Sequence, residues 1–546
     1  MPPKRSPHRP ARRVLRAGLL ALCAPVALAG CVHVFWRTEA RAVARPAAGD
    51  TTVTQVRTPL RAHLVDGGTV VFRHGALVGR GVLAGDGVAY GLLGRTSSAR
   101  GAVPLDSVAA IETFEGKVLG APTVLVSTAA TALGAVAAAG LAVAIFGSCP
   151  TVYADTGAGP VLEAEGFSYA IAPLFEQRDL DPLRVRPGAD GVVRLELRNE
   201  ALETHRINQI ALTAVRHAAG TRVVPDQGGR PVIVGDERPA AAATDRAGRD
   251  VRAALAAAEG TLFASDARTV AAAREGDLDD WIDVTAADLP PGDSVAVVLR
   301  LRNSLLNTVL LYEGILGGRD AADWMTTGLQ HIGGAVDVAR WYGRTMGLRA
   351  TVHGAPAGAA PARLGDVGPI AFRDVALVVP RPARDARTVR VRLRFVADNW
   401  RIDQARVAGV VARPTEVTEL PVARVVVPTP VDGGGPRPDT AAVTALAEPD
   451  DRYLETRPGQ RMTLEFDPAR PDVSRRVATG GDTTTTYLIV WQGWYNEWIR
   501  GSWLARPTRT TPFVPGDAAV LAALHRWRAR QGELEPAFYA SRLPVR

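Results

Sequence analysis

Short runs in which apolar and polar residues alternate occur along most of the chain and predict a mainly β, multidomain protein. The clearest are 195–204 (LELRNEALET) and 299–308 (LRLRNSLLNT), in which leucines alternate with polar residues before the asparagine. Because successive side chains of a strand point to opposite faces, each pair of leucines is expected on one face of a sheet. The asparagine is expected to bond to the backbone of the turn that follows.

These two runs share the pattern L-x-L-R-N-x-x-L-x-T, and the second begins 104 residues after the first. A looser third copy occupies 389–407. A period of about 100 residues is typical of β-sandwich domains, so we expect two or three β-sandwich-like units.

Residues 53–117 predict a small N-terminal β module. Their short apolar runs are broken by Asp66-Gly67-Gly68 and by Asp86-Gly87. Glycine tolerates the positive φ of tight hairpin turns, so these breaks indicate antiparallel strands. The preceding residues, 31–52, have no sustained apolar period and are expected to be a tether.

Residues 118–148 form one long uncharged, Ala/Gly-rich apolar stretch, and it predicts a helix that ends before Pro150. As a helix, 121–146 would span about 39 Å, and a bilayer core is about 30 Å thick. Small residues that would let a second helix approach closely recur at Ala130, Gly134, Ala138 and Ala142. The stretch is therefore either membrane-associated or a buried helix of a soluble domain.

The remaining residues divide by composition. The expected order is β-sandwich-like units over 155–353, a linker at 354–368, a β-rich unit over 369–427, a linker at 428–440, and a β unit with a short C-terminal helix over 441–546. The linkers are predicted from their Gly, Pro and Ala content, and the helix from the amphipathic pattern after Asp517.

Positive charge is concentrated at the N-terminus. Of the formal net charge of +8, six positive charges lie within the first 16 residues, which leaves +2 for the rest of the chain. A nucleic-acid site requires basic residues clustered on one face, and no basic run follows residue 30. We expect no nucleic-acid partner.

Residues 1–30 have the order of an export signal, with a cationic, an apolar and a small-residue part. The stretch Leu28–Cys31 (LAGC) resembles the lipobox of bacterial lipoproteins, which implies cleavage before Cys31 and a lipid on it. Val32 stands where retention signals of inner-membrane lipoproteins have Asp, which implies the outer membrane. Arg12-Arg13 resembles a twin-arginine signal, so the route of export stays open.

Cys149 is the one cysteine that is neither in the signal nor lipidated. The stretch 148–153 (SCPTVY) resembles a set of uncharacterised bacterial envelope proteins, in which an apolar segment ends in Ser-Cys-Pro-x-Val-Tyr and a β-rich region follows. The resemblance implies no activity. Cys149 is a candidate for a buried residue at the turn, a reactive thiol, or a disulfide to another chain.

Two groups of acids are candidates for chemistry. One group allows acid–base catalysis or an ion-paired surface; it is Glu163, Glu165, Glu176 and Asp179. The other suggests a calcium site or a solvated turn; it is Glu275, Asp277, Asp279, Asp280 and Asp283.

Aromatic residues are dense near the C-terminus. They suggest a platform for a sugar or a partner, or packing between a strand and the terminal helix. The candidates are Trp491, Trp494, Tyr495 and Trp498.

The sequence has no Gly-x-Ser-x-Gly elbow, no phosphate-binding loop and no histidine pair spaced for a helical metal site. We therefore expect no cofactor, and an enzyme is the less favoured class. The leading prediction is a lipid-anchored structural or interaction scaffold at the cell envelope, on the periplasmic or the surface side, with a homo-oligomer or an envelope protein as partner. Two alternatives are a pore or export accessory that oligomerises through 121–146, and an extracytoplasmic hydrolase whose site is assembled in space.

Overall fold

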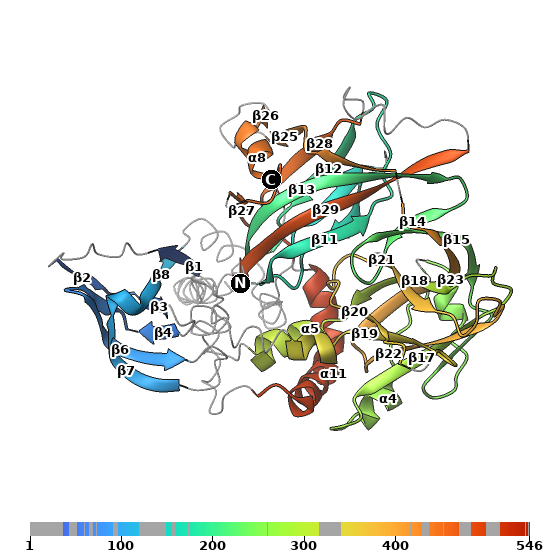
Figure 1. The fold of residues 1–546 in the computed structure, drawn as a ribbon, viewed down its shortest axis with the longest axis horizontal. Helices are drawn as coiled ribbons and strands as arrows, with labels where there is room; N and C mark the ends of the chain where they lie inside the picture. Colours follow the sequence, from blue (N-terminus) through green and yellow to red (C-terminus); the bar gives the residue numbers. More distant parts are fainter. Residues whose placement is uncertain are drawn as a thin grey trace, which may run out of the picture.

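The computed structural model describes residues 36–118 and 149–545 apart from gaps, the longest of which are 43–51, 316–339, 429–435, 469–481 and 498–513. The described part is mainly β, with several antiparallel sheets, few helices, and a C-terminal helix α11 (Asp517–Ala540) (Figure 1). The predicted fold class is confirmed at this level. The predicted export signal, Cys31 and the apolar stretch from residue 119 to 148 lie outside the described residues.

The N-terminal module is one eight-stranded sheet around a small core that includes Leu60, Phe72 and Leu83. Its strands are β1 (Trp36–Ala42), β2 (Val53–Val56), β3 (Leu60–Leu64), β4 (Thr69–Phe72), β5 (Ala76–Gly79), β6 (Val82–Tyr90), β7 (Ser97–Pro104) and β8 (Val108–Val118). Strand β1 lies in the predicted tether and pairs along its whole length with β8. That expectation is corrected for residues 36–42, because their backbone pairs with β8 and forms the edge strand of the sheet.

A second unit, the outer unit, consists of residues 149–218 and 417–497. One of its sheets has the order β10-β9-β12-β28-β25-β26, and the other the order β11-β29-β13-β24 with β27 beside β13. Its strands are β9 (Thr151–Asp155), β10 (Pro160–Glu165), β11 (Gln177–Pro182), β12 (Val193–Arg198), β13 (Glu203–Ala218), β24 (Val417–Pro421), β25 (Arg424–Val427), β26 (Arg437–Pro438), β27 (Leu454–Thr456), β28 (Arg461–Phe466) and β29 (Thr483–Glu497). Both sheets contribute to one hydrophobic core.

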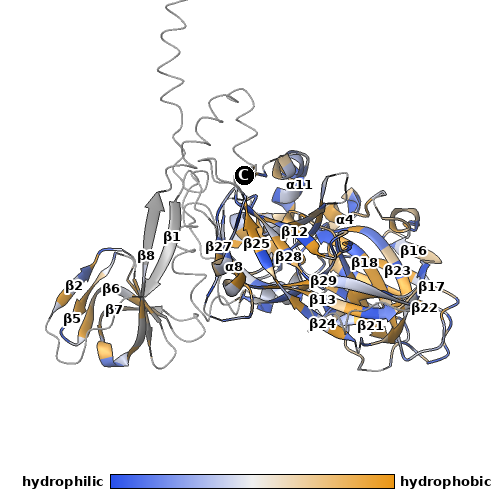
Figure 2. Ribbon diagram, turned by 90° about the horizontal axis from the view of Figure 1, so that it is seen from above, coloured by the Kyte–Doolittle hydropathy of each residue, from blue (hydrophilic) through white to orange (hydrophobic). Residues whose placement is uncertain are grey.

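A third unit, the inserted unit, consists of residues 222–412 and lies in the chain between β13 and β24. Its two five-stranded sheets have the orders β14-β15-β23-β18-β21 and β16-β17-β22-β19-β20, and they too share a core. Its strands are β14 (Arg222–Pro225), β15 (Pro231–Pro239), β16 (Ala242–Asp245), β17 (Asp279–Ala286), β18 (Ser294–Asn303), β19 (Leu348–Val352), β20 (Ala362–Leu364), β21 (Arg373–Pro380), β22 (Val389–Val396) and β23 (Trp400–Ala412). Figure 2 shows hydrophobic and hydrophilic residues mixed along the strands of both units.

The insertion corrects the predicted order of consecutive units. Strand β13 pairs with β29, so Glu203–Ala218 lies beside residues 483–497. The predicted linker 354–368 contains β20 and the buried Val367, and it is part of the inserted unit. Alternation along the chain identifies a strand but not its partner, so no sequence pattern indicated that one unit interrupts another.

The structure confirms that the paired leucines of the repeated pattern face a hydrophobic core. Leu195 and Leu197 of β12 are at most 2% exposed in the outer core, and Leu299 and Leu301 of β18 are fully buried in the inserted core. The two asparagines of the pattern, Asn199 and Asn303, bind different kinds of partner. Asn199 Oδ1 accepts the N–H of Ala201 in the following turn, as predicted, at 3.3 Å. In the second copy, Asn303 Oδ1 instead accepts the N–H groups of Val367 and Gly368, which lie 64 and 65 residues further along the chain.

Helices fill one side of the inserted unit. α11 packs against α5 (Leu306–Val309) and the adjoining π-helix η4 (Leu310–Ile315), as Figure 1 shows. Their shared core includes Leu310 and Trp527, and the Trp527 Nε1 donates to Asp398 Oδ2 at 2.6 Å. Two short helices, α4 (Ala267–Ala272) and α8 (Thr440–Ala445), each follow an aspartate cap, whose side chain accepts two backbone N–H groups at α4 and one at α8.

Candidate functional site

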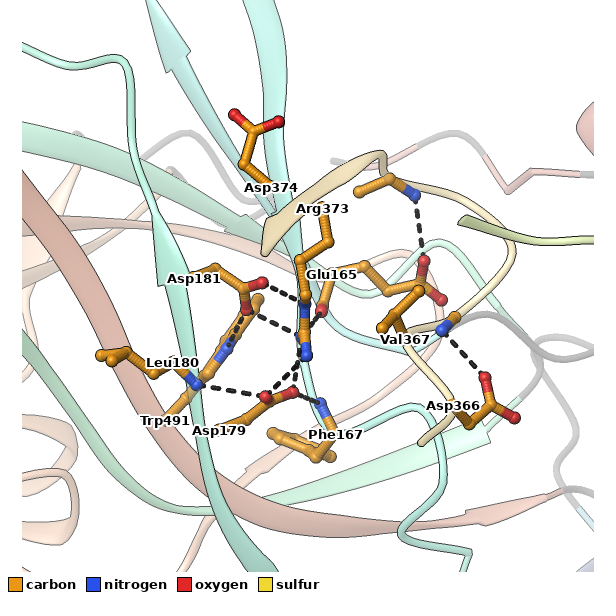
Figure 3. Close-up of polar contacts among 12 residues, drawn as sticks. Glu165, Phe167, Asp179, Leu180, Asp181, Asp366, Val367, Arg373, Asp374 and Trp491 are labelled. Carbon is orange, nitrogen blue, oxygen red and sulfur yellow. Dashed lines mark hydrogen bonds and ion pairs between the residues drawn. The ribbon is translucent and has the colours of Figure 1, made fainter. Parts of the chain in front are cut away.

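Arg373 joins the outer and inserted units through a buried ion-pair cluster (Figure 3). It is the first residue of β21, and its guanidinium binds two carboxylates of β11. Nη1 and Nη2 donate to the two oxygens of Asp179 at 2.9 and 2.7 Å, and Nε lies 2.5 Å from Asp181 Oδ1. Because residues two apart on a strand point to the same face, Asp179-Leu180-Asp181 directs both carboxylates at one arginine.

The two carboxylates are also fixed by donors of the outer unit. The backbone N–H groups of Phe167 and Leu180 donate to Asp179 at 3.2 and 3.1 Å. Trp491 Nε1 donates to Asp181 Oδ2 at 3.0 Å. The outer unit therefore positions both carboxylates independently of Arg373.

Burial governs the electrostatics of this cluster. The side chains of Arg373, Asp179 and Asp181 are 11%, 9% and 4% exposed. Burial raises the pKa of Asp181 against the attraction of Arg373, and the charge of Asp179 raises it further. Burial alone would lower the pKa of Arg373, but Asp179 and Asp181 outweigh it and hold that pKa above its ordinary value.

Glu165, the last residue of β10, reaches from the outer unit to the inserted unit. Its Oε2 accepts the N–H groups of Ile370 and Ala371 at 2.7 and 3.0 Å. Burial raises the pKa of Glu165 to about 7, although these two N–H groups oppose the shift. Gly368 passes over the carboxylate with φ +92°, and a Cβ atom there would lie 2.5–2.6 Å from it. Only glycine fits that position.

Two asparagines hold the segment 366–371 in place: Asn303, the last residue of β18, and Asn307 of α5. Asn303 Oδ1 accepts the N–H groups of Val367 and Gly368 at 2.8 and 3.1 Å. Asn307 Nδ2 donates to Asp366 Oδ2 at 3.0 Å, and the Tyr342 hydroxyl donates to the same oxygen at 2.6 Å. Burial raises the pKa of Asp366 against these donors.

A cavity of about 640 Å³ lies between the two units and is lined by both. Its charged lining consists of Glu165, Glu176, Arg178, Asp226, Asp366 and Arg373. Its aromatic lining consists of Tyr169, Phe175, Tyr312, Tyr342 and Tyr495. An apolar pocket of this size with a few converging polar groups is the usual form of a small-molecule site.

The four acids predicted as a group separate in the structure. Glu165 and Glu176 line the cavity, while Asp179 belongs to the Arg373 cluster. Glu163 instead accepts the N–H of Arg184 at 2.7 Å. Glu176 Oε1 accepts from Asn208 and its Oε2 from the Tyr453 hydroxyl, both at 2.8 Å.

Cys149 is 4% exposed and also lines the cavity. A disulfide to another chain would require this residue to leave the core of the outer unit. The rest of its motif has a structural role, because the hydroxyls of Thr151 and Tyr153 both donate to Glu200, at 2.9 and 3.0 Å. Arg542 binds the same carboxylate from the C-terminal end of the chain.

The predicted aromatic residues that the structure describes do not form one platform. Trp491 is buried and meets Phe167 edge to face at 6.1 Å, and the Tyr495 hydroxyl donates to the Ser168 carbonyl at 3.0 Å. Trp494 packs instead beside Tyr453. They lie on β29, and their packing partners belong to the outer unit, not to the terminal helix; Trp498 lies outside the described residues.

Three of the five acids considered for calcium, Asp277, Asp279 and Asp283, are ion-paired with arginines. Asp277 binds Arg246 at 2.9 Å, and Asp283 binds Arg390 and Arg392 at 2.6 and 2.7 Å. Asp279 likewise binds Arg349 and Arg394. Across the part of the chain that the structure describes, no group of three or more acids, histidines or cysteines is arranged to hold a metal ion.

Sequence reasoning missed the inserted unit's share of the site, which comprises Asn303, Asn307, Tyr342, Asp366 and Arg373. The asparagine of the second repeat copy was noticed, but a turn was expected to be its partner. Asp181 could have been found beside Asp179, since two acids at alternate positions of a strand point the same way. Arg373 carries no such signal, because its partners are 192 or more residues away.

No protein-family model matches this chain, and a search of curated proteins found no similar sequence. Among the helices of the described residues, none is both long and apolar enough to cross a membrane.

Proposed function

We propose that this protein is a lipid-anchored component of the cell envelope, in the outer membrane, whose outer and inserted units are β-sandwiches that act as one binding scaffold. The export signal and the lipobox at Cys31 support the anchor. The two-sheet cores support the sandwich assignment.

The observation that carries the binding role is the Arg373 cluster beside the cavity. A buried guanidinium held by two carboxylates fixes the two units against each other. The cavity between them is therefore preformed, and a preformed site loses less conformational entropy when it binds a ligand or a partner.

The carboxylates of this region mostly have donors already. Asp179 and Asp181 bind Arg373, and Glu176 accepts from three side chains. Such groups shape a site more readily than they transfer protons. This favours a scaffold that binds over a hydrolase.

The anchor is tested by fractionating cells that express the wild-type protein or the Cys31→Ser variant. We expect the wild-type protein in the outer membrane, and the variant unprocessed and not in the outer membrane. Protease treatment of intact cells then reports which side the two units occupy. A Cys31→Ser variant that reaches the outer membrane as the wild-type protein does would contradict the proposal.

A hydrolase is a second candidate, because Glu165 and Asp366 both have raised pKa values and line one cavity. Chromogenic glycoside, ester and peptide substrates test it. Turnover by the wild-type protein that is lost in Glu165→Gln would favour this class. The pore or export role rests on residues 121–146, outside the described residues, and stays a prediction.

A further inference from the structure

One sheet of the inserted unit, β16-β17-β22-β19-β20, has an outward face rich in arginine. In β22, Val391, Leu393 and Phe395 are buried in the inserted core, so the arginines between them lie on the opposite face. This alternation separates the arginines in the sequence, where they form no basic run. On β17, β22, β19 and β20, the charged residues of this face are Arg349, Arg363, Arg390, Arg392 and Arg394 with Asp279 and Asp283. Arginines outnumber aspartates there by three.

The sheet register places three arginines directly beside one another. Arg349 of β19 is opposite Arg363 of β20 on one side and opposite Arg394 of β22 on the other. The Cβ atoms of directly opposite residues are about 4.5–5.5 Å apart, and like charges at this separation destabilise a sheet. The row is therefore stabilised by anions bound between its guanidinium groups.

The chain supplies one such anion. Asp279 lies between two members of the row, because Arg349 Nη2 is 3.0 and 2.9 Å from its two oxygens and Arg394 Nε is 2.6 Å from Oδ2. Arg363, at the end of the row, is exposed, and its side chain makes no ion pair or hydrogen bond with the described residues. The row therefore has one carboxylate from the chain and a free guanidinium for a second.

The other arginines of β22 are also neutralised only in part. Arg390 and Arg392 share Asp283, with Nη2 atoms 2.6 and 2.7 Å from Oδ2. His353 Nε2 lies 3.2 Å from the other oxygen of the same carboxylate. Each aspartate of the face thus serves two arginines, so the face keeps a net positive charge.

Carboxylates are the anions that this face fits best. Two guanidinium groups, those of Arg246 and Arg392, lie 4.8 and 4.9 Å from the ring centroid of Trp281, so this ring is engaged by cations rather than open to a sugar. Duplex DNA carries one negative charge per about 1.7 Å of its axis, and would bring phosphates against Asp279 and Asp283. A segment with a few separated carboxylates avoids that repulsion.

We infer that this sheet face binds an acidic segment of a partner protein. One carboxylate of the segment lies between Arg363 and Arg349, in the geometry that Asp279 shows between Arg349 and Arg394. Another meets Arg390, and the planar guanidinium suits such paired contacts. The inference goes beyond the proposed cavity site by adding a second binding surface, and it rests on neither the cavity nor the lipid anchor.

The test is fluorescence anisotropy with the mature full-length protein in nonionic detergent micelles. The probes are two labelled peptides of equal length, one of alternating glutamate and glycine and one of alternating glutamine and glycine. We expect the glutamate peptide to bind at least about tenfold more tightly, a difference of about 1.4 kcal/mol. Added salt should weaken it, because exposed charges are screened.

Arg363→Glu should abolish binding of the glutamate peptide. Because the Arg363 side chain has no partner among the described residues, the substitution leaves the ion pairs of the face intact, and circular dichroism should show a folded protein. Arg100→Glu is the matched control, since Arg100 is an exposed arginine on β7 of the N-terminal module, and it should bind as the wild-type protein does.

Asp279→Asn gives a second test with the opposite sign. It removes the carboxylate that the chain itself places in the row and frees Arg349 and Arg394 for the peptide. The glutamate peptide should therefore bind at least about threefold more tightly than to the wild-type protein. A role of Asp279 confined to folding predicts no such gain.

Equal binding of the two peptides, wild-type affinity of Arg363→Glu, or binding by Asp279→Asn that is no tighter than wild type would each overturn the inference. Tighter binding of duplex DNA or of a polyuronate than of the glutamate peptide would also overturn it, because the face would then fit another class of partner. The Cys31→Ser experiment does not involve this face, so a protein that fractionates as expected but binds no acidic peptide leaves the proposed location standing.

Discussion

The carboxylate of Glu165 lies so close to the α-carbon of Gly368 that a Cβ atom there would come within 2.5 Å of the carboxyl carbon. This contact joins the last residue of β10 in the outer unit to the loop 366–371 of the inserted unit. One wall of the cavity therefore depends on a backbone conformation that only glycine adopts readily.

Gly368→Ala should destabilise the protein by about 2–4 kcal/mol, because it adds left-handed backbone strain and overpacking against Glu165. Urea unfolding measures the change. Gly365→Ala is the control, since a Cβ atom at residue 365 meets nothing within 4 Å, and its effect should stay within about 0.5 kcal/mol. Equal effects of the two substitutions would contradict the close contact.

Arg373→Met should cost about 3–5 kcal/mol, because it leaves Asp179 and Asp181 buried without their cation. The triple variant Arg373→Met/Asp179→Asn/Asp181→Asn should recover part of the loss, since it removes the unpaired charges as well. Both are measured by denaturant unfolding. Arg384→Met is the control, because the Arg384 side chain is 77% exposed and its Nη1 lies 3.6 Å from Asp293 Oδ1. It should change stability by less than about 1 kcal/mol.

The stability of the protein should depend on Glu165 between about pH 4.5 and pH 7. Its pKa is raised from 4.5 to about 7, so the folded state holds a proton that the unfolded state has already released in this range. The contribution of Glu165 to stability therefore falls as pH rises through the window, by at most about 3 kcal/mol.

Glu165→Gln removes this titration. The free energy of unfolding of the variant, minus that of the wild-type protein, should become more positive from pH 5 to pH 8 in urea titrations. Glu163→Gln keeps Glu165 and should follow the wild-type slope. A difference between Glu165→Gln and wild type that does not change with pH would show that the carboxyl is not titrating in this range.

Tyr153→Phe should cost about 1–2 kcal/mol, because it removes a buried hydrogen bond to the charged Glu200. Tyr153→Leu should cost more, since the Arg198 guanidinium lies 3.8 Å from the centre of the Tyr153 ring and loses that contact as well. Thermal unfolding compares the two variants. Tyr487→Phe is the control, because burial alone raises the pKa of the Tyr487 hydroxyl and no hydrogen bond from the described residues contributes, so the variant should be close to neutral.

Much of the local structure was predictable. Alternation identified the strands around Leu195 and Leu299 and the burial of their leucines, because the period of a strand depends on the chain alone. Likewise, the amphipathic pattern after Asp517 predicted a C-terminal helix, and these residues form α11.

The site was predictable only in part. Glu165 and Glu176 were among the candidate acids and do line the cavity. Asp179 was also a candidate acid, but its ion-pair partner Arg373 was not predicted, because Arg373 lies 194 residues further along the chain. Asn303 was expected to act within its own turn, and instead it holds the loop 366–371.

The sequence by itself determined which segments are strands, which faces of them are apolar, and the export and lipidation signals that lead us to expect an envelope protein. These properties depend on neighbouring residues, whose side-chain periodicity and chemistry can be read directly. Only the tertiary structure decided that residues 222–412 interrupt another unit, and that Glu165, Asn303 and Asn307 meet at one cavity. Those contacts join residues far apart in the chain, and their geometry is set by how whole sheets pair and pack, which no local pattern specifies.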